Sequence, residues 1–234
     1  MTAAEPRPSS IGGMPTPGTP PTERTRVRRL PERGVYDRAT IDAVLDEALY
    51  CHLAYIDEDG RPRVIPTIHV RVGDTVYVHG SAASHTLRRI DGREVCLVAT
   101  LLDGLVLARS AFHHSMNFRS VVVYGPARRV DDPDEKWTAQ AALVDHVCAG
   151  RAEQARMPDD VELKQTTIVA IPLVEASAKV RTGPPKDDHG DLDLPVWAGV
   201  LPLRLVPGEP EDDPRLAPGL EPPENVTRYR RPGT

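Results

Sequence analysis

The sequence predicts a mainly β domain with flanking helices, in which antiparallel strands close, or nearly close, into a barrel. Short apolar runs rich in β-branched residues follow one another closely after residue 50. Asp-Gly or Gly-Asp steps, which tolerate the backbone angles of tight reversals, lie between several of them, at Asp59-Gly60, Gly73-Asp74 and Asp103-Gly104. Many short antiparallel strands at regular spacing, with helices inserted at the edges, are typical of a β-barrel.

The strand pattern recurs along most of the central part of the chain. In each run, β-forming residues are bounded by turn residues. One long run contains a Gly-Pro step at which we expect a kink. The predicted strands are Cys51–Ile56, Arg63–Val72, Thr75–Val78, Glu94–Leu101, Gly104–Ala108, Ser120–Val130, Gln165–Pro172 and Ala176–Arg181.

Three segments carry helical signals instead. The first begins at Asp37 or Thr40, either of which is a suitable cap, and a short second helix covers Ser84–Ile90. The third covers Asp131–Gly150, with Pro133 in its first turn. Its apolar residues predict a buried stripe, which consists of Trp137, Ala141, Leu143, Val144 and Val147.

The two ends of the chain have a different composition from the centre. Residues 1–34 are rich in Pro, Gly, Ser, Thr and Arg and show no apolar periodicity, so we expect a flexible arm. The arginines of this arm are expected either to keep the chain soluble or to contact a partner, which would be RNA or an acidic protein surface. Residues 207–234 are similar and predict a second flexible tail. The folded domain is therefore expected over residues 35–206.

Composition limits the possible functions. The chain has 234 residues, 40% of them hydrophobic, and a formal net charge of −5, which gives no reason to expect a nucleic-acid binder. No apolar run approaches the about 20 residues that span a bilayer, and no secretory signal is evident, so a cytoplasmic protein without membrane contact is expected. The cysteines Cys51, Cys96 and Cys148 lie far apart among apolar residues and are expected to be buried thiols.

The segment from His79 to Arg89 is a candidate phosphate site. It leaves a strand, passes small residues and enters a helix, which brings backbone N–H groups and hydroxyl donors together. The alternative is an ordinary loop in which Ser84 caps the helix. The segment matches neither the P-loop nor the dinucleotide glycine pattern.

The segment Arg109–Ser120 is dense in polar groups that can bind a ligand. His113 and His114 are adjacent, so an extended backbone points them to opposite faces and no shared metal is expected.

Alternation along the strand places His69 on the same face as Ile65 and Thr67, and His79 lies one hairpin away. A Ser-His-Asp hydrolase is an alternative function, but the chain has no Gly-x-Ser-x-Gly nucleophile motif.

Two features near the C-terminal end of the domain have open interpretations. Trp197 is either a core anchor or a residue that stacks on a planar ligand. Lys179, Arg181 and Lys186 form either a solvated face or an anion clamp.

Taken together, Gly60–His69, Val78–Arg89, Asp103–Val121 and Val196–Leu203 resemble the pyridoxamine 5'-phosphate oxidase-like flavin split-barrel family. The most similar branch contains nitroimidazole reductases and flavin-nucleotide-binding proteins. The resemblance covers residues 35–206. It implies an antiparallel split β-barrel and a homodimer that binds flavin mononucleotide, FMN, at the subunit interface.

The resemblance also implies roles for particular residues. The strand Val64–His69 would lie along the flavin ring. The turn His79-Gly80-Ser81 would lie near the ribityl chain, and Ser84, His85 and Thr86 would hold the phosphate. In this chain His85-Thr86 replaces the Arg-Lys pair of the oxidases, so Arg88 or Arg89 would compensate. His69 would face the substrate. The expected cofactor contacts are Val64, Ile65, Pro66, Thr67, His79, Gly80, Ser81, Ser84, His85, Thr86, Arg88, Asn117, Ser120 and Trp197.

The leading functional hypothesis is an FMN-dependent oxidoreductase that transfers hydride to or from a small planar substrate. The Arg-x-His substrate motif of true pyridoxamine-phosphate oxidases has no counterpart after Arg204. The alternatives are a non-catalytic flavin-, deazaflavin- or haem-binding protein, with His113, His114 or His69 as a haem ligand, and a regulatory flavin sensor.

Overall fold

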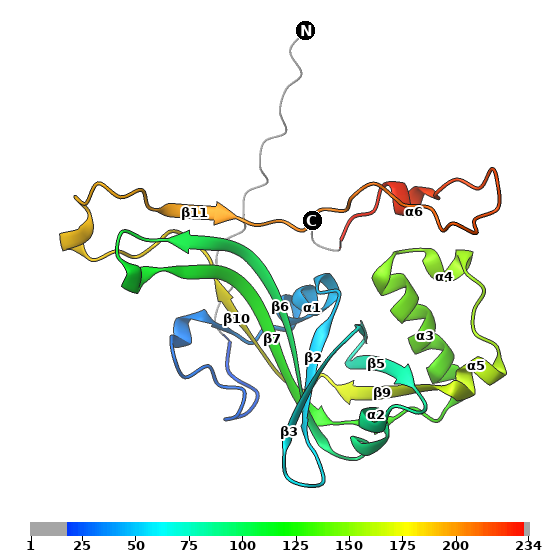
Figure 1. The fold of residues 1–234 in the computed structure, drawn as a ribbon. Helices are drawn as coiled ribbons and strands as arrows, with labels where there is room; N and C mark the ends of the chain where they lie inside the picture. The colour runs from blue at the N-terminus through cyan, green and yellow to red at the C-terminus, as the bar shows by residue number, and fades with distance from the viewer. Residues whose placement is uncertain (1–17, 232–234) are drawn as a thin grey trace.

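The computed structural model describes residues 18–231, and within them the chain forms two antiparallel sheets with helices at their edges (Figure 1). The larger sheet has the order β1-β10-β7-β6-β2-β3, and β11 also pairs with β6. The smaller sheet has the order β4-β5-β9-β8. The strands are β1 (Gly34–Val35), β2 (Cys51–Ile56), β3 (Pro62–Thr67), β4 (His69–Val72), β5 (Thr75–Ser81), β6 (Glu94–Leu107), β7 (Ser115–Pro126), β8 (Arg128–Arg129), β9 (Thr166–Pro172), β10 (Glu175–Arg181) and β11 (Gly199–Pro202).

The helix Pro133–Val147 packs on the smaller sheet, and the helix Arg38–Glu47 contacts strands of both sheets. Asp37 caps the first helix by accepting a hydrogen bond from the Thr40 backbone N–H at 2.9 Å, as the sequence predicts. Short 3₁₀ turns lie at Pro31–Arg33, Ala111–His113 and His189–Asp191. The α-helices are α1 (Arg38–Glu47), α2 (His85–Arg89), α3 (Pro133–Val147), α4 (Arg151–Gln154), α5 (Asp160–Gln165) and α6 (Glu224–Thr227).

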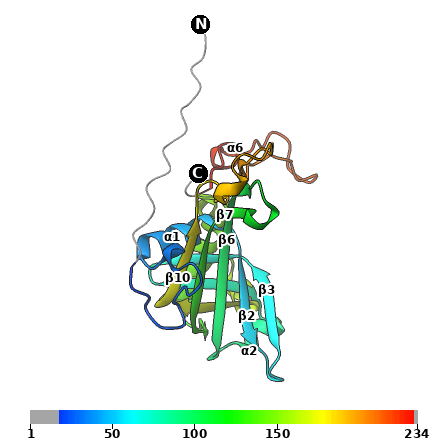
Figure 2. The same ribbon diagram turned by 90° about the vertical axis from the view of Figure 1, so that its left-hand side faces the viewer.

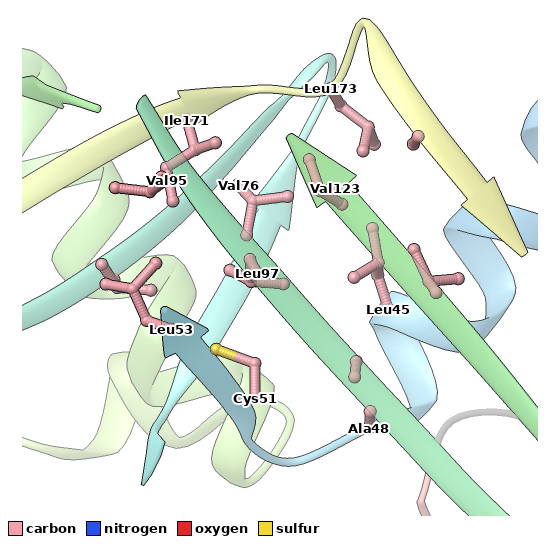
Figure 3. Close-up of a cluster of buried hydrophobic side chains, with 14 of the residues drawn as sticks. Leu45, Ala48, Cys51, Leu53, Val76, Val95, Leu97, Val123, Ile171 and Leu173 are labelled. Atoms are coloured by element: carbon pink, nitrogen blue, oxygen red, sulfur yellow. The ribbon is translucent and has the colours of Figure 1, made fainter. Parts of the chain in front are cut away.

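The main core lies between the two sheets and α1 (Figure 3). Its side chains are almost all aliphatic, because the chain has few aromatic residues. Leu45, Leu53, Leu97 and Ile171 are fully buried, and burial of each side chain stabilises the fold by about 2 kcal/mol. The expected antiparallel split barrel is therefore the observed fold.

The predicted strand Arg63–Val72 is in fact two strands that belong to different sheets. β3 pairs with β2 in the larger sheet, whereas β4 pairs with β5 in the smaller one. The chain changes sheet at Ile68. Sequence alternation does not reveal this corner, because residues on either side of it keep an extended backbone. His69 is therefore separated from the face on which the sequence places it with Ile65 and Thr67.

The turn predicted at Asp103-Gly104 is also wrong. β6 runs through it without a break and shows only a bulge between Leu102 and Gly104. A Cβ atom at Gly104 would lie 3.0 Å from the carbonyl oxygen of Leu201, so this glycine permits the close approach of β11. The distal halves of β6 and β7 form a two-stranded ribbon, residues 102–118, that projects beyond the barrel (Figure 1).

Residues 18–34, which the sequence places in a flexible arm, make specific contacts with the barrel. The Arg24 guanidinium is 2.6 Å from a Glu94 oxygen, also pairs with Glu175, and lies over the ring of Tyr124. The Lys179 ammonium donates to the Arg29 carbonyl at 3.2 Å. This segment is therefore held against the larger sheet. The rest of the predicted arm, residues 1–17, lies outside the described residues.

Part of the predicted C-terminal tail also contacts the domain. The Asn225 side chain donates to the Ala149 carbonyl at 2.9 Å, and the Arg231 guanidinium donates to the Glu47 carbonyl at 2.8 Å. Residues 232–234 lie outside the described part of the chain.

The helix α3 packs through a different face from the predicted stripe. Ala139 and Leu143 are buried against the smaller sheet, whereas Trp137 and Val147 are about half exposed. Only Leu143 of the predicted stripe is fully buried, because the fold seats the helix on the narrow face around Ala139 rather than on its largest side chains.

Candidate functional site

The predicted cofactor residues lie in three regions of the structure. The first is the rim formed by α2 and the β2–β3 hairpin. The second is the outer face of the larger sheet, and the third is the projecting ribbon. A few predicted residues lie in none of these regions and have structural roles instead.

The loop before α2 presents hydroxyl groups that remain able to donate hydrogen bonds to an anion. Ser81 Oγ accepts the Ala83 N–H at 3.1 Å, and Ser84 Oγ accepts the Leu87 N–H at 3.3 Å. Each oxygen thus uses a lone pair, and its O–H stays available to donate. The exposed side chains of His85 and Arg88 lie beside them. This set of donors fits a phosphate oxygen, even without the Arg-Lys pair.

The α2 loop is tied to the β2–β3 hairpin. The hydroxyl groups of Tyr55 and Thr86 are 3.1 Å apart and share a hydrogen bond. Arg89 and Arg93 lie 3.5 and 3.7 Å from the carboxylate of Glu58 in the hairpin turn. The phosphate-binding candidates and β3 therefore form one continuous rim.

Strand β3 is an edge strand of the larger sheet, and its side chains divide between two faces. Val64 and Pro66 are exposed on the outer side, whereas Ile65 packs partly against the core. Thr67 is paired with Cys51 on the inner side. An edge strand leaves backbone groups available for a ligand. The geometry of β3 permits a contact between this backbone and a flavin ring, and that contact stays a prediction.

Over β6, β2 and β3 the outer face of the larger sheet carries mostly apolar side chains and is uncovered (Figure 2), whereas Arg24 lies over Tyr124 further along β7. The register places Pro66, His52, Val98 and Val122 in one row across four strands. Figure 2 shows no helix in front of β6, β2 and β3. Ser120 points to this same face, because it is two residues from Val122 on β7. The exposed side of β3 is continuous with this face.

Two residues that the sequence predicts to contact the cofactor, His79 and Gly80, have structural roles. A Cβ atom at Gly80 would meet a methyl group of Leu87 at 2.8 Å, so glycine is required for α2 to pack on β5. His79 is half-buried opposite Ile168, its Nδ1 atom has no hydrogen-bond partner, and burial lowers its pKa. The predicted contact of His79 and Gly80 with a cofactor stays a prediction.

His69, the predicted substrate-side residue, has no exposed surface. Its Nε2 atom donates to the Leu45 carbonyl oxygen at 3.0 Å, and its ring centroid is 5.2 Å from that of His146. Burial, and next the neighbouring His146, lower the pKa of His69 to about 4. The structure thus places His69 in the packing between α1 and α3, where no substrate reaches it.

The remaining predicted contacts lie on the ribbon. Asn117 is buried and accepts a short hydrogen bond from the Arg181 guanidinium, whose other contacts are the carbonyls of Gly183 and Pro184. Asn117 is therefore engaged in holding the loop after β10. Trp197 is exposed, and a Cβ atom at Gly199 would lie 2.8 Å from its ring, so the indole packs over that glycine.

One face of the ribbon is a platform of solvent-accessible apolar side chains, which we call the ribbon platform. Leu105, Met116 and Leu201 occupy one row across β6, β7 and β11 and therefore point to the same side. Met116 and Leu201 are each half exposed. Leu102 and Phe118 form the next row toward the barrel, so the platform continues into the outer face of the larger sheet.

The opposite face of the ribbon is covered. Val106 is fully buried, and the Arg109 guanidinium binds the Asp187 carboxylate at 2.9 Å. Residues 182–188 thus border the ribbon on one edge and β11 borders it on the other. The platform is not among the sites predicted from the sequence. Its alternation is visible in the sequence, but nothing there shows that β11 would extend it.

Three further observations concern metal ligands, thiols and membrane-spanning helices. Among residues 18–231, no cluster of three or more His, Cys, Asp or Glu side chains is arranged to hold a metal ion. The three cysteines carry free thiols, and burial raises the pKa of Cys51 to about 12. In the same part of the chain, no helix combines the length and apolar character needed to cross a membrane.

The two antiparallel sheets define the protein as an antiparallel split barrel. The family model described as Pyridoxamine 5'-phosphate oxidase matches residues 37–180, and the chain belongs to this family. No curated protein matches the chain.

The chain is similar to two solved structures over almost its whole length. One is the flavocytochrome Anf3 from Azotobacter vinelandii, with 39% identity, a TM-score of 0.86, and coverage of 92% of this chain and 100% of that chain. The other is an FAD- and haem-binding protein from Mycobacterium smegmatis, with 32% identity, a TM-score of 0.80, and coverage of 85% and 98%.

A third structure shows a likeness of fold alone. It is a putative 5-nitroimidazole antibiotic resistance protein from Bacteroides thetaiotaomicron, with 22% identity and a TM-score of 0.53, covering 63% of this chain and 86% of that chain.

Proposed function

We propose that this protein is a redox protein that binds both a flavin and a haem. The observation that carries the proposal is the likeness, over nearly the full chain, to a flavocytochrome and to an FAD- and haem-binding protein. Such coverage extends well past residue 180, where the family model ends, and takes in most of the segment that contains β11 and the C-terminal contacts. A bound flavin supplies hydride chemistry, and a bound haem supplies one-electron chemistry.

The rim is the proposed flavin site. The hydroxyls of Ser81 and Ser84, with Arg88, bind the phosphate, and the outer edge of β3 binds the ring. A phosphate seat of this kind serves FMN, which the sequence predicts, and FAD alike. Mass identification of the flavin released on denaturation distinguishes the two. The substrate class proposed for this site is a small planar molecule that exchanges hydride with the flavin.

We propose that a second copy of this chain covers the outer face of the larger sheet. Monomeric proteins rarely expose a large contiguous apolar surface to solvent. The rows through Val98 and Val122 are apolar, and no described helix packs on them. Because β3 borders this face, the flavin site would lie at the junction of the two copies.

The rim assignment predicts the effect of a double substitution. Ser81→Ala with Arg88→Ala is expected to weaken flavin affinity tenfold or more, about 1.4 kcal/mol, because a hydroxyl donor and a cation are removed. A fluorescence titration of the apoprotein measures this affinity. Arg129→Ala removes an exposed arginine of β8 and is the matched control, with affinity unchanged. If the double variant and the control bind flavin equally tightly, the loop is not part of the flavin site.

The dimer assignment predicts the effect of a charge on the outer face. Val122→Glu is expected to give a species with the 25.6 kDa mass of one chain, because a carboxylate in an apolar interface is costly to desolvate. Light scattering after size-exclusion chromatography measures the mass. Thr138→Glu, on the exposed face of α3, is the control and keeps the dimer mass. A wild-type protein that is monomeric at micromolar concentration contradicts the proposal.

A further inference from the structure

The position of one histidine on the ribbon points to the residue that binds the haem iron. His114 Nδ1 lies 3.0 Å from the Ser110 carbonyl oxygen. A carbonyl only accepts, so Nδ1 carries the proton and Nε2 keeps its lone pair. Metal-binding histidines commonly donate one ring N–H to a backbone carbonyl in this way, which fixes the tautomer and the ring orientation. The side chain of His114 is exposed, so Nε2 is accessible.

The surroundings of His114 suit a flat apolar macrocycle. His114 directly precedes β7, with φ −59° and ψ 141°, and lies two residues before Met116, so we infer that its side chain lies on the side of the ribbon platform. Leu107 and Gly199 continue its row across the ribbon, and the exposed indole of Trp197 packs over Gly199. Phe112, 87% exposed, lies two residues before His114. Apolar side chains therefore flank the histidine along the ribbon.

Cations are available for the carboxylates of a haem. Lys186 lies in the segment that borders one edge of the ribbon, and Arg204 lies two residues after β11 on the other edge. Both side chains are exposed. An accessible imidazole nitrogen, an apolar platform and cations at its margins are together the donor set that a haem requires.

The other histidines do not combine these features. The Nε2 atoms of His69 and His146 bind the carbonyls of Leu45 and Ala48. His113, adjacent to His114, has its Nε2 atom buried and 3.1 Å from the Asp188 carboxylate. The exposed His85 and His189 lack, among the described residues, a ring hydrogen bond like that of His114. His79 is half-buried, and His52 lies on the face proposed to be covered by the second copy.

We propose that His114 Nε2 is an axial ligand of the haem iron and that the ribbon platform binds one face of the porphyrin. The proposal rests on the proposed function, since it requires that the protein binds haem. His113 has a different role, because its ring faces Asp188 and helps to hold the loop of residues 182–188 against the ribbon.

The test is titration of the haem-free full-length protein with haemin, followed by the Soret band and by the electron paramagnetic resonance signal of the ferric form. We expect His114→Ala to lose the histidine-ligated signal and to bind haem roughly 100-fold more weakly. Added imidazole restores the signal in that variant. His113→Ala is the matched control, because it removes the adjacent ring, and it keeps the wild-type signal.

A second variant tests the platform without touching the ligand. Met116→Glu places a charge beside His114 and is expected to weaken haem binding at least tenfold, while the flavin affinity of the rim is unchanged. Flavin affinity in every variant also confirms that the barrel is folded. A wild-type protein that binds no haem overturns the proposed function. Haem that binds the wild type and His114→Ala with identical spectra overturns the assignment of the ligand alone, as does loss of the signal in His113→Ala instead.

Discussion

Replacement of Arg119 by methionine is expected to lower the free energy of unfolding by about 3–5 kcal/mol. Arg119 lies on β7 at the base of the ribbon, and its guanidinium binds two carboxylates. One is Glu47, at the end of α1, with Nη2 to Oε1 at 3.0 Å. The other is Asp103 on β6, with Nη2 to Oδ1 at 2.8 Å. Both carboxylates raise the pKa of Arg119.

The large size of the effect comes from the burial of Glu47. Its side chain is only 8% exposed, so removal of Arg119 would leave a carboxylate in a poorly solvated site without its partner. Methionine fills a similar volume but supplies no charge. Urea unfolding at neutral pH measures the change.

Two further variants separate charge from packing. Arg119→Met combined with Glu47→Gln removes the uncompensated charge and is expected to recover a substantial part of the lost stability. Arg128→Met breaks the more exposed pair with Glu135 and serves as a control, with a loss below about 1 kcal/mol. A loss of that same small size for Arg119→Met would show that Glu47 is solvated in the folded protein.

The second prediction is a loss of stability as the pH falls from about 6.5 to about 4. The neutral imidazole of His69 donates from Nε2 to Leu45, so its Nδ1 is unprotonated, and Nδ1 is buried without a hydrogen-bond partner. Protonation would place an N–H and a positive charge in that site. Burial and the His146 ring therefore lower the pKa of His69 to about 4, against the opposing effects of the Leu45 carbonyl and the Asp46 carboxylate.

The direction of the pH effect follows from this lowered pKa. The unfolded chain, with a histidine pKa near 6.5, binds the proton more tightly than the folded protein. The contribution of His69 is complete above pH 6.5 and is lost as the pH falls toward 4, a change of roughly 3 kcal/mol. Most carboxylates titrate below this window, so the slope between pH 6.5 and 4.5 reports mainly on histidine.

Denaturant unfolding at a series of pH values measures the slope. His69→Gln keeps an amide N–H donor for the Leu45 carbonyl but does not titrate, so the slope of its stability between pH 6.5 and 4.5 should be much smaller, with the remainder due to His79, whose pKa burial also lowers. His146→Gln retains His69 and should keep most of the slope. A wild-type slope that survives in His69→Gln would assign the effect to another group.

These two predictions concern residues whose roles the sequence does not reveal. Strand alternation places His69 on the face of Ile65 and Thr67, but the corner at Ile68 moves it into the other sheet. Arg119 lies inside the segment Arg109–Ser120 that carries the resemblance, yet no local pattern connects it with Glu47, which lies 72 residues earlier. Contacts between distant segments have no periodicity that a sequence window can detect.

The ribbon differs from its sequence-based prediction for a similar reason. The sequence shows apolar alternation on both sides of Asp103-Gly104, and the turn preference of that step predicts a reversal. In the structure Gly104 serves the close approach of β11 instead, and the chain reverses only at residues 108–114. Glycine meets both requirements equally well, so its presence alone does not distinguish a turn from a close contact.

Local chemistry is sufficient for several features of this protein: the Asp37 cap, the strand Cys51–Ile56, the Ser84 cap before α2 and the aliphatic composition of the core are all evident in the sequence. Hydrogen bonding within a turn and alternation along a strand depend on neighbours in the chain, so the sequence determines them. Only the tertiary structure decides which faces stay uncovered, which histidine is buried and which one keeps an accessible nitrogen. Those outcomes depend on contacts between strands and helices from distant parts of the chain, because such contacts determine which side chains are buried.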